Sequence, residues 1–322
     1  MRRLRTKALT AATMVFMLGA AAACGSSSDG EADSGGPQKV TVGIIAIVDV
    51  APLYLGDEQG FFEERGIELT MESGQGGAAI VPGVMSGQFQ FGFSNVTSLM
   101  LARDQGLPLK IVAPGNSSTG VDGEDFSAVV VTDDSPIQSA KDLAGKTVAV
   151  NTLKNIGDTT IRESIRKDGG DPDSVKFVEL ALPDMPAAVA NGQVDAAWVV
   201  EPFVAISKGQ GDRVIASNLV DTAPDLMIAG YFTSEELAQS DPELVENFVA
   251  AMTESLEYAD AHPDEARDIV STYTEIDAET LANVTLPKWP TTINEESTQK
   301  LADLAEQDGL VEQPVDLSAL LP

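Results

Sequence analysis

Few residues in this chain could do covalent chemistry. Among its 322 residues the sequence holds one cysteine, Cys24, and one histidine, His262. A disulfide framework or a cysteine-based zinc site needs several cysteines, and a Ser-His-Asp triad needs a histidine beside a nucleophile. His262 precedes Pro263 and Asp264, a pattern typical of a solvated turn that begins a helix. We therefore expect no metal site, no cofactor and no enzyme.

Two glycine-containing stretches look like phosphate-binding loops but lack their context. Gly74–Ala79 fits a GxGxxA pattern, yet it follows the second strand, and no acidic residue stands about 20 positions further on. Gly145-Lys146-Thr147 resembles the end of a P-loop, but no glycine stands five residues earlier, and the segment opens a strand. Neither stretch predicts a nucleotide site.

The net charge of −30 argues against nucleic acid as a partner, because binding it requires a positive field that displaces counterions. The acidic residues are dispersed along the chain, which is typical of a solubilising surface. This net charge says little about the charge of the ligand. Salt screens surface charges beyond a Debye length of about 8 Å, so dipoles close to the ligand outweigh them.

The spacing of apolar residues predicts two similar halves. Val40, Val42 and Ile44 alternate as a strand, and a helical stretch is expected around Pro52–Glu64. This order of short apolar strands and amphipathic helical stretches, seen first between residues 40 and 72, returns after Thr147, which indicates an α/β fold. Val84–Phe91 matches Val189–Ala196 at an offset of 105 residues, with a Gly-Gln turn in both. The alternative is a chance agreement between two α/β stretches.

The last third of the chain is predicted to be helical. After an apolar strand-like run over Leu226–Thr233, Ser240 and Glu243 form a capping-box pattern. Helices of about 10–15 residues are expected to begin at Pro263, Ala278 and Glu295. They have no strands of their own to cover, so we expect them to pack back against the first half.

The N-terminus reads as an export signal followed by a tether. A basic head, Arg2 to Lys7, precedes an apolar stretch that is shorter than the about 20 residues needed to span a bilayer. Ala21-Ala22-Ala23-Cys24-Gly25 resembles the lipobox of bacterial lipoproteins, although Leu is commoner than Ala21 at its first position. We expect a signal peptide over 1–23 and a flexible tether over 24–38 that begins at lipidated Cys24. Ordinary signal cleavage with an incidental Cys24 is the alternative.

Several motifs in order resemble the substrate-binding lipoproteins of ABC importers. They include Ala51–Gly56, Gln59–Phe62, the Ser86-Gly87-Gln88 turn, Gly145–Val150 and Val194–Pro202. The branch they resemble covers nitrate, alkanesulfonate, taurine, aromatic carboxylates and thiamine-pyrimidine precursors. Each motif alone is weak, whereas their order together with the lipobox is more specific.

The resemblance implies the type II periplasmic-binding-protein fold, with two α/β lobes joined by two crossing strands and a ligand cleft between them. Lobe 1 is expected over 39–126 plus 230–322 and lobe 2 over 127–229, with crossings near Ser127–Val131 and Leu226–Tyr231. The implied mechanism is ligand capture by hinge closure, followed by presentation to a membrane permease. The implied protein is a monomer outside the cytoplasmic membrane, attached to it only through its lipid.

Ligands of α/β lobes bind beyond the carboxyl ends of strands, where helix N-termini present free N–H groups. In the first lobe this rule selects Asp49, Val50, Gln75, Gly76, Gly77, Ser94, Asn95 and Asn116. In the second it selects Asn151, Thr152, Asn155, Ile156, Trp198 and Glu201.

Several of these residues have a purely structural alternative. Ser94, Asn95 and Asn155 are also good helix N-caps. Trp198 could belong to the core, or pair with Phe93 to sandwich a flat ligand ring. Glu201 should meet a donor, such as a ligand amine, a hydroxyl or Lys154, unless it only starts a surface helix.

Two other functions stay open on the sequence. An enzyme on the same fold would need histidine and cysteine residues that this chain lacks in suitable places. A sensor or interaction lipoprotein that signals by closure would have the same sequence features, so the sequence does not separate it from an importer component.

Overall fold

The computed structural model describes residues 36–322. The expected signal peptide over 1–23, the lipidation site Cys24 and most of the expected tether over 24–38 lie outside the described residues. Within the described part, no helix has both the length and the apolar character needed to cross a membrane.

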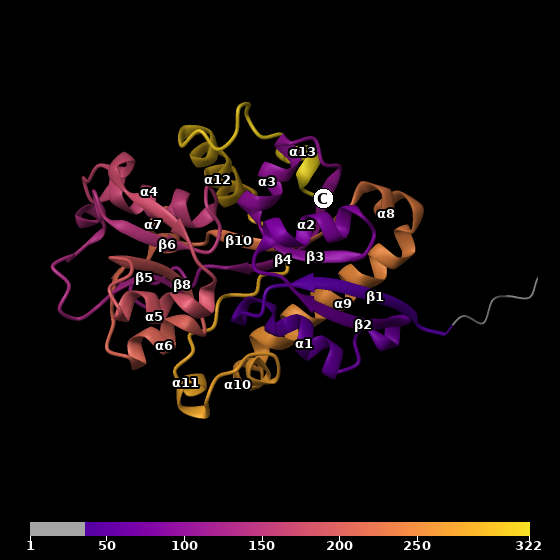
Figure 1. Ribbon diagram of the computed structural model, residues 1–322. Helices are drawn as coiled ribbons and strands as arrows, with labels where there is room; N and C mark the ends of the chain where they lie inside the picture. Colours follow the sequence, from indigo (N-terminus) through magenta and orange to yellow (C-terminus); the bar gives the residue numbers. More distant parts are fainter. Residues whose placement is uncertain (1–35) are drawn as a thin grey trace, which may run out of the picture. The chain divides into compact units, whose positions relative to one another are not determined.

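The first sheet has the strand order β2-β1-β3-β10-β4 (Figure 1). β1 runs parallel to β2 and β3, whereas β10 is antiparallel to β3 and β4. The alternating Val40, Val42 and Ile44 of β1 are buried, as their spacing predicts. The bounds are β1 (Gln38–Ile44), β2 (Ile67–Ser73), β3 (Phe91–Asn95), β4 (Leu109–Ser117) and β10 (Met227–Ser234).

The second sheet repeats this arrangement with the order β7-β6-β8-β5-β9. Its antiparallel strand, β5, lies between β8 and β9 as β10 lies between β3 and β4. Val42 pairs with Phe91 in the first sheet, and Val148 pairs with Ala196 in the second. The offset in sequence therefore corresponds to a repeated topology. The bounds are β5 (Ser127–Val131), β6 (Thr147–Val150), β7 (Lys176–Glu179), β8 (Ala196–Val200) and β9 (Arg213–Ala216).

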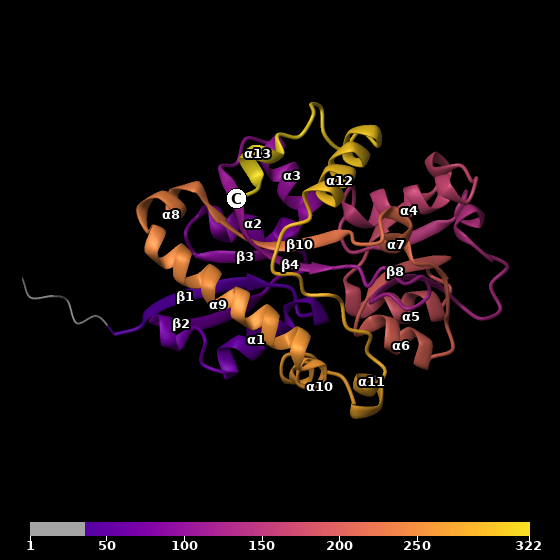
Figure 2. The ribbon, with the colours of Figure 1, turned by 180° about the vertical axis from the view of Figure 1, so that it is seen from behind.

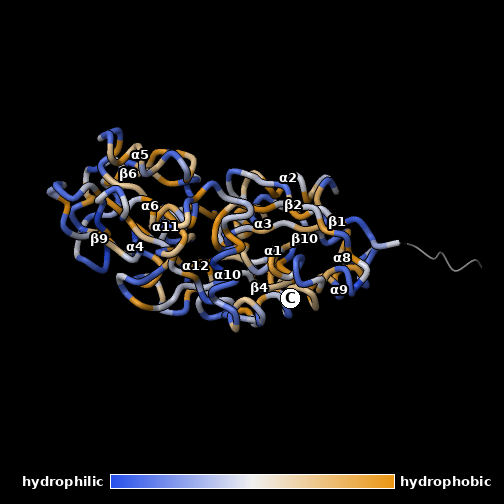
Figure 3. Tube along the Cα trace, turned by 90° about the horizontal axis from the view of Figure 1, so that it is seen from below, coloured by the Kyte–Doolittle hydropathy of each residue, from blue (hydrophilic) through white to orange (hydrophobic). Residues whose placement is uncertain are grey.

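Helices cover both sheets, and apolar segments run through the middle of each half while hydrophilic segments lie at the periphery (Figure 3). α9 packs along α1 and β4 of the first sheet, where Phe248 stacks on Phe91 with ring centroids 3.8 Å apart. The helices between strands are α1 (Ala51–Glu58), α2 (Gly77–Met85), α3 (Val96–Asp104), α4 (Ile156–Lys167), α5 (Met185–Ala190), α6 (Phe203–Gly209) and α7 (Asn218–Thr222).

The first helix is shorter than its sequence pattern predicts. We expected it to run from Pro52 to Glu64, but it ends at Glu58. Gly60 has a φ of +84°, the left-handed conformation that terminates helices, and a separate 3₁₀ turn follows at Glu63–Arg65.

The chain crosses between the sheets at different positions from those expected. Ser127–Val131 and most of Leu226–Tyr231 are strands β5 and β10, each paired on both sides within one sheet. The connections are instead 118–126 and 223–226, and they lie side by side, because the Ser118 amide donates to the Leu226 carbonyl over 2.9 Å. The expected lobe boundary at residue 229/230 consequently falls inside β10.

The C-terminal helices also differ from the expectation in part. Asp241, not Ser240, caps α9, since the Asp241 carboxylate accepts from the Leu244 amide and Ser240 ends α8. α10 and α11 have only six and five residues, shorter than expected, and a 3₁₀ turn over Ile269–Thr272 follows α10 directly. The bounds are α8 (Glu235–Ser240), α9 (Pro242–Ala261), α10 (Pro263–Asp268), α11 (Ala278–Ala282), α12 (Glu295–Gln307) and α13 (Leu317–Leu320).

This C-terminal segment does not pack on the first half alone. α11 contacts α6 of the second half, and α12 contacts both α3 and α4. Figure 2 shows the chain between α11 and α12 running along the boundary between the sheets, where Lys288 forms a β-bridge with Ser117. The segment is therefore a third connection between the halves.

A network of four charged side chains joins α12 to α4. Glu163 accepts from Arg166 over 3.0 Å and pairs with Lys300 over 3.1 Å, while Arg166 also pairs with Asp308. Burial raises the pKa of Glu163, but hydrogen bonds from Lys300 and Arg166 outweigh it and hold the pKa below its usual value. The network thus stabilises the charged form of a buried carboxylate.

We predict that Asp308→Asn lowers the free energy of unfolding by roughly 1–3 kcal/mol, because it removes one of the two carboxylates that pair with the partly buried Arg166. Asp225→Asn is the matched control: Asp225 pairs with Lys288 on the surface, so its loss should cost at most about 0.5 kcal/mol. Urea denaturation of both variants measures the difference. Equal losses would contradict a structural role for the network.

Candidate functional site

The loops selected by the strand-end rule converge along one edge of the first sheet. β1, β2 and β3 end there, β4 ends there too, and the antiparallel β10 begins there. After β1 a short 3₁₀ helix, Val48–Val50, leads into α1, while β2 and β3 lead into α2 and α3. This edge faces the second half, as the contacts below show.

Two glycines begin α2 at this edge. Gly76 precedes the helix with no side-chain cap, so the first amides of α2 have no side-chain acceptor. A Cβ at Gly77 would stand 1.8 Å from Ser94 Oγ, so only glycine fits there. Ser94 is buried, whereas Gln75 is exposed. The arrangement leaves bare backbone N–H groups beside a hydroxyl.

The second half meets this edge through the start of α4. Asn155 Nδ2 donates to Ser98 Oγ over 2.9 Å, and the side chains of both residues are buried. A Cβ at Gly76 would lie 3.0 Å from Thr152 Oγ1 and 3.3 Å from Asn151 Nδ2. The helix starts of α2, α3 and α4 therefore lie together in the contact between the halves.

Asn95 and Asn155 do act as N-caps. Asn95 Oδ1 accepts from the Ser98 amide, and Asn155 Oδ1 accepts from the amide of Ile156, the first residue of α4. Helix capping therefore explains one hydrogen bond of Asn95 and one of Asn155. Asn155 has a second contact, to Ser98 across the boundary, that capping does not require.

Asp49 and Asn116 form a buried pair at the same edge. The Asn116 Nδ2 donates to Asp49 Oδ1 over 2.9 Å, which joins the loop after β1 to the end of β4. Burial raises the pKa of Asp49 to about 7. The neighbouring Val50 is a core residue without polar side-chain atoms.

Glu201 has internal partners instead of the expected ligand donor or Lys154. Glu201 Oε2 accepts from the Ala205 amide and Oε1 from the Thr285 amide, each over 3.0 Å. Burial raises its pKa to about 7. Since Thr285 belongs to the C-terminal segment, this carboxylate ties that segment to the second half, and it is not a surface residue either.

The two aromatic residues at matching positions do not form a sandwich. Phe93 packs on Tyr231 within the first half, with centroids 5.3 Å apart. Trp198 lies beneath the first turn of α4 close to Gly157, and its indole donates to Ser127 Oγ over 2.7 Å. The core alternative describes Trp198 better.

Sequence reasoning missed two residues of this boundary, Ser98 and Thr285. Ser98 lies one helical turn beyond the selected Asn95, so extending the strand-end rule by one turn would have found it. Thr285 comes from a loop far along the chain, and no local pattern marks it.

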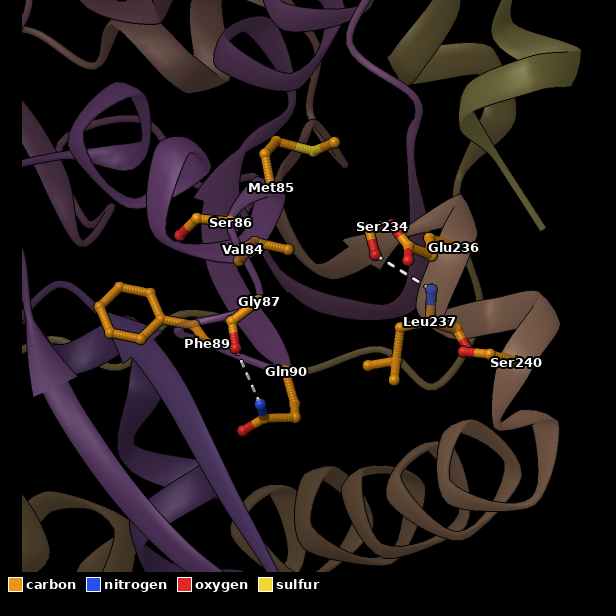
Figure 4. Close-up of a pocket in the computed structure, with 10 residues that line it drawn as sticks. All are labelled: Val84, Met85, Ser86, Gly87, Phe89, Gln90, Ser234, Glu236, Leu237 and Ser240. Carbon is orange, nitrogen blue, oxygen red and sulfur yellow. Dashed lines mark hydrogen bonds between the residues drawn. The ribbon is translucent and has the colours of Figure 1, made fainter.

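A separate surface pocket lies at the opposite edge of the first sheet, among the end of α2, the turn that follows it, the end of β10 and α8 (Figure 4). None of the residues that line it was selected from the sequence. Within residues 36–322 no group of three His, Cys, Asp or Glu side chains is placed to hold a metal ion. His262 is exposed between α9 and α10.

These elements and contacts agree with a known family. A sequence model of the family described as "NMT1/THI5 like" matches residues 47–266, more than half of the chain. The chain belongs to this family. The resemblance predicted from the ordered motifs is thereby confirmed, as is the two-lobed α/β fold.

Individual relatives are distant in sequence. A putative aliphatic sulfonates-binding protein of Bacillus subtilis is 23% identical over 276 residues, or 84% of this chain and 79% of the relative. Among solved structures, the alkanesulfonate-binding protein SsuA of Xanthomonas axonopodis pv. citri, bound to MOPS, gives a TM-score of 0.73 at 17% identity, over 90% of this chain and 99% of that one. The desulfurization enzyme DSZB gives a TM-score of 0.64 at 17% identity, over 87% of this chain and 95% of that one.

The raised pKa values of Asp49 and Glu201 predict that the free protein is more stable at pH 5 than at pH 8. Between an ordinary carboxyl pKa and 7 the folded chain holds protons that the unfolded chain has lost, so the free energy of unfolding falls as pH rises through this window. One pKa unit corresponds to about 1.4 kcal/mol. We therefore expect the free energy of unfolding to fall by more than about 1 kcal/mol for each of the two carboxyl groups between pH 5 and pH 8.

Urea denaturation at both pH values measures this loss. Asp49→Asn should reduce the pH dependence, because the amide oxygen can still accept from Asn116, whereas Asp133→Asn at an exposed position should not. If the free energy of unfolding increased between pH 5 and pH 8, the raised pKa values of Asp49 and Glu201 would be contradicted.

Proposed function

We propose that this chain is the solute-binding component of an ABC importer, which captures a small polar or anionic organic compound between its halves and presents it to a permease. The observation that carries the proposal is the meeting of three helix starts and their polar side chains at the boundary, exemplified by Ser98 and Asn155. Family membership supports the same role.

The chemistry of the boundary favours a ligand with an anionic group. Backbone N–H groups at a helix N-terminus carry partial positive charge and bind oxyanions. The start of α2 offers such groups next to the Ser94 hydroxyl, with Asn151 and Thr152 opposite. Sulfonates, nitrate and aromatic carboxylates are the anionic candidate ligand classes, and pyrimidine-type compounds are the polar one.

Hinge closure is the proposed mechanism, and polar contacts between the halves support it. The Val48 amide donates to the Glu201 carbonyl over 3.2 Å, a second bond between the halves beside the Ser98–Asn155 pair. Each such bond contributes only about 1 kcal/mol net, so opening is accessible and a ligand can shift the balance.

An enzyme on the same fold is the second candidate, because the fold of DSZB shows that this architecture also occurs in catalysts. The boundary carries amides, hydroxyls and two carboxylates with internal partners, but no histidine, since His262 lies exposed elsewhere. Capture without bond cleavage is therefore the better-supported function.

Titration calorimetry of the full chain against the four ligand classes tests the proposal. At least one class should bind with a Kd below about 1 mM. Asn155→Ala should weaken that binding about tenfold, since it removes one hydrogen bond made on closure, whereas Asn191→Ala at the exposed end of α5 should leave it unchanged. A lack of binding to all four classes, with no small molecule retained in native mass spectrometry of protein from its own host, would contradict the proposal.

We further propose that Cys24 is acylated and holds the protein as a monomer at the outer face of the cytoplasmic membrane. The support is the sequence order of basic head, apolar stretch, Ala21–Gly25 and tether. One lipid cluster can hold a protein at a membrane without a spanning helix.

Metabolic labelling with a clickable fatty acid tests the anchor. The wild-type chain should carry label and sediment with membranes, and Cys24→Ser should lose both properties. A Cys24→Ser chain that still sediments with membranes would show that another feature attaches it.

A further inference from the structure

The loop between β6 and α4 has an unusual backbone conformation. The loop spans residues 151–155, and its Lys154 has a φ of +53°, the only positive φ of a non-glycine residue within residues 36–322. This left-handed conformation costs free energy in a residue with a side chain, because the Cβ crowds the following carbonyl oxygen. Such residues persist where surrounding contacts hold them, and they are frequent at functional sites.

This loop belongs to the boundary between the halves. Thr152 Oγ1 and Asn151 Nδ2 lie 3.0 and 3.3 Å from the place where a Cβ at Gly76 would stand. Asn155, the last residue of the loop, donates to Ser98 Oγ over 2.9 Å. The conformation of the loop therefore determines where its polar side chains lie relative to the bare N–H groups at the start of α2.

Two carboxylates from flanking elements hold the backbone of the loop. The Lys154 amide donates to Asp158 Oδ2 over 2.9 Å, and the Leu153 amide donates to Glu179 Oε2 over 3.1 Å. Asp158 lies in the first turn of α4, and Glu179 ends β7, where it pairs in register with Val150 just before the loop. The two bonds thus fix consecutive peptide groups from two different elements.

Helix capping does not explain the Asp158 contact. In a capping box the third residue of a helix accepts from the amide of the N-cap residue, which is Asn155 here. Asp158 accepts instead from Lys154, the residue before the cap, so this bond holds the loop. Apolar packing does not fix the turn either, since the side chains of Leu153 and Lys154 are exposed.

The position of Asp158 is costly for its charge. The residue is 5% exposed, and burial raises the pKa of its carboxyl to about 6, although the Lys154 amide and Arg162 act in the opposite direction. Its Oδ1 has no hydrogen-bond partner among the described residues. A buried carboxylate with an unpartnered oxygen is unfavourable, so stability alone would favour an uncharged residue at this place.

We propose that Asp158 and Glu179 are positioning residues of the ligand site, which hold the loop in the conformation that presents Asn151 and Thr152 to the captured compound. This inference rests on the proposed function. Neither carboxylate needs to touch the compound. Their effect is preorganisation, because a loop that is already ordered loses less conformational entropy when the halves close on a ligand.

Alanine variants and their conservative partners test both carboxylates in the full chain. Ethanesulfonate, nitrate, benzoate and aminopyrimidine represent the four ligand classes, and the compound that binds the wild type most tightly in titration calorimetry is the probe. Asp158→Ala should raise the Kd of this probe about tenfold, and Glu179→Ala, at an exposed position, severalfold. Asp158→Asn and Glu179→Gln should stay within about threefold of the wild type, because their amide oxygens can still accept the same bonds.

Asp195→Ala is the matched control. Asp195 Oδ2 accepts from the Thr147 amide over 2.8 Å, so this exposed carboxylate makes the same kind of bond at the other end of β6, away from the boundary. Its loss should leave the Kd of the probe unchanged. Equal weakening by Asp158→Ala, Glu179→Ala and Asp195→Ala would show only a general loosening of the second half and would overturn the inference.

A double variant tests the left-handed residue itself. Glycine adopts a positive φ readily, so in a Lys154→Gly background the loop should depend less on Asp158. The variant with both Lys154→Gly and Asp158→Ala should therefore bind the probe severalfold more tightly than Asp158→Ala alone, a coupling that independent sites do not show. A double variant that binds no better than Asp158→Ala would contradict the role of Asp158 in holding this turn.

Hydrogen exchange of the free protein is a second measurement, which needs no added compound. Asp158→Ala and Glu179→Ala should speed exchange in the peptide that covers residues 151–155, whereas Asp195→Ala should not. If exchange speeds up while the Kd stays at the wild-type value, or if exchange does not change, the positioning role is wrong and solute binding stands. If no probe binds the wild type and native mass spectrometry finds no retained small molecule, the proposed function fails together with this inference.

Discussion

The boundary between the two halves must satisfy the polar groups that end the first sheet. Parallel strands deliver their loops to one edge, and each following helix begins there with amides that lack partners inside the helix. In this protein Asn95 and Asn155 cap α3 and α4, and Asn155 then bonds to Ser98 across the boundary. The start of α2 has glycines in place of a cap. The edge thus carries hydrogen-bonding groups from several helix starts, and the contact between the halves includes polar pairs as well as apolar residues.

The C-terminal segment limits how the halves can move. Two connections, 118–126 and 223–226, lie next to each other and would allow rotation about one line. The segment between α11 and α12 adds a third connection, bonded to Glu201 on one side and to Ser117 on the other. The ion pairs between α4 and α12 add further contacts, because α12 also packs against α3 of the first half. Opening must therefore stretch or release these contacts, which makes them part of the energy difference between open and closed states.

The sequence predicted what depends on local pattern and failed where distant segments meet. Alternating Val40, Val42 and Ile44 and the offset of 105 residues led to the two sheets, because periodicity and turns are local signals. The strand-end rule placed Gly76, Gly77 and Asn155 at the boundary for the same reason. It could not place Thr285 against Glu201, because that contact comes from the packing of the C-terminal segment. Ser240 was mistaken for a cap because adjacent Asp241 offers the same chemistry.

The two buried carboxylates of the boundary have different roles because of their partners. Glu201 accepts two backbone amides, one of them from Thr285, so it ties the C-terminal segment to the second half. Asp49 accepts one side-chain amide, from Asn116, and joins the loop after β1 to the end of β4 within the first half. Burial raises the pKa of both carboxyls to about 7, so each of these ties depends on a group whose charge is costly inside the protein.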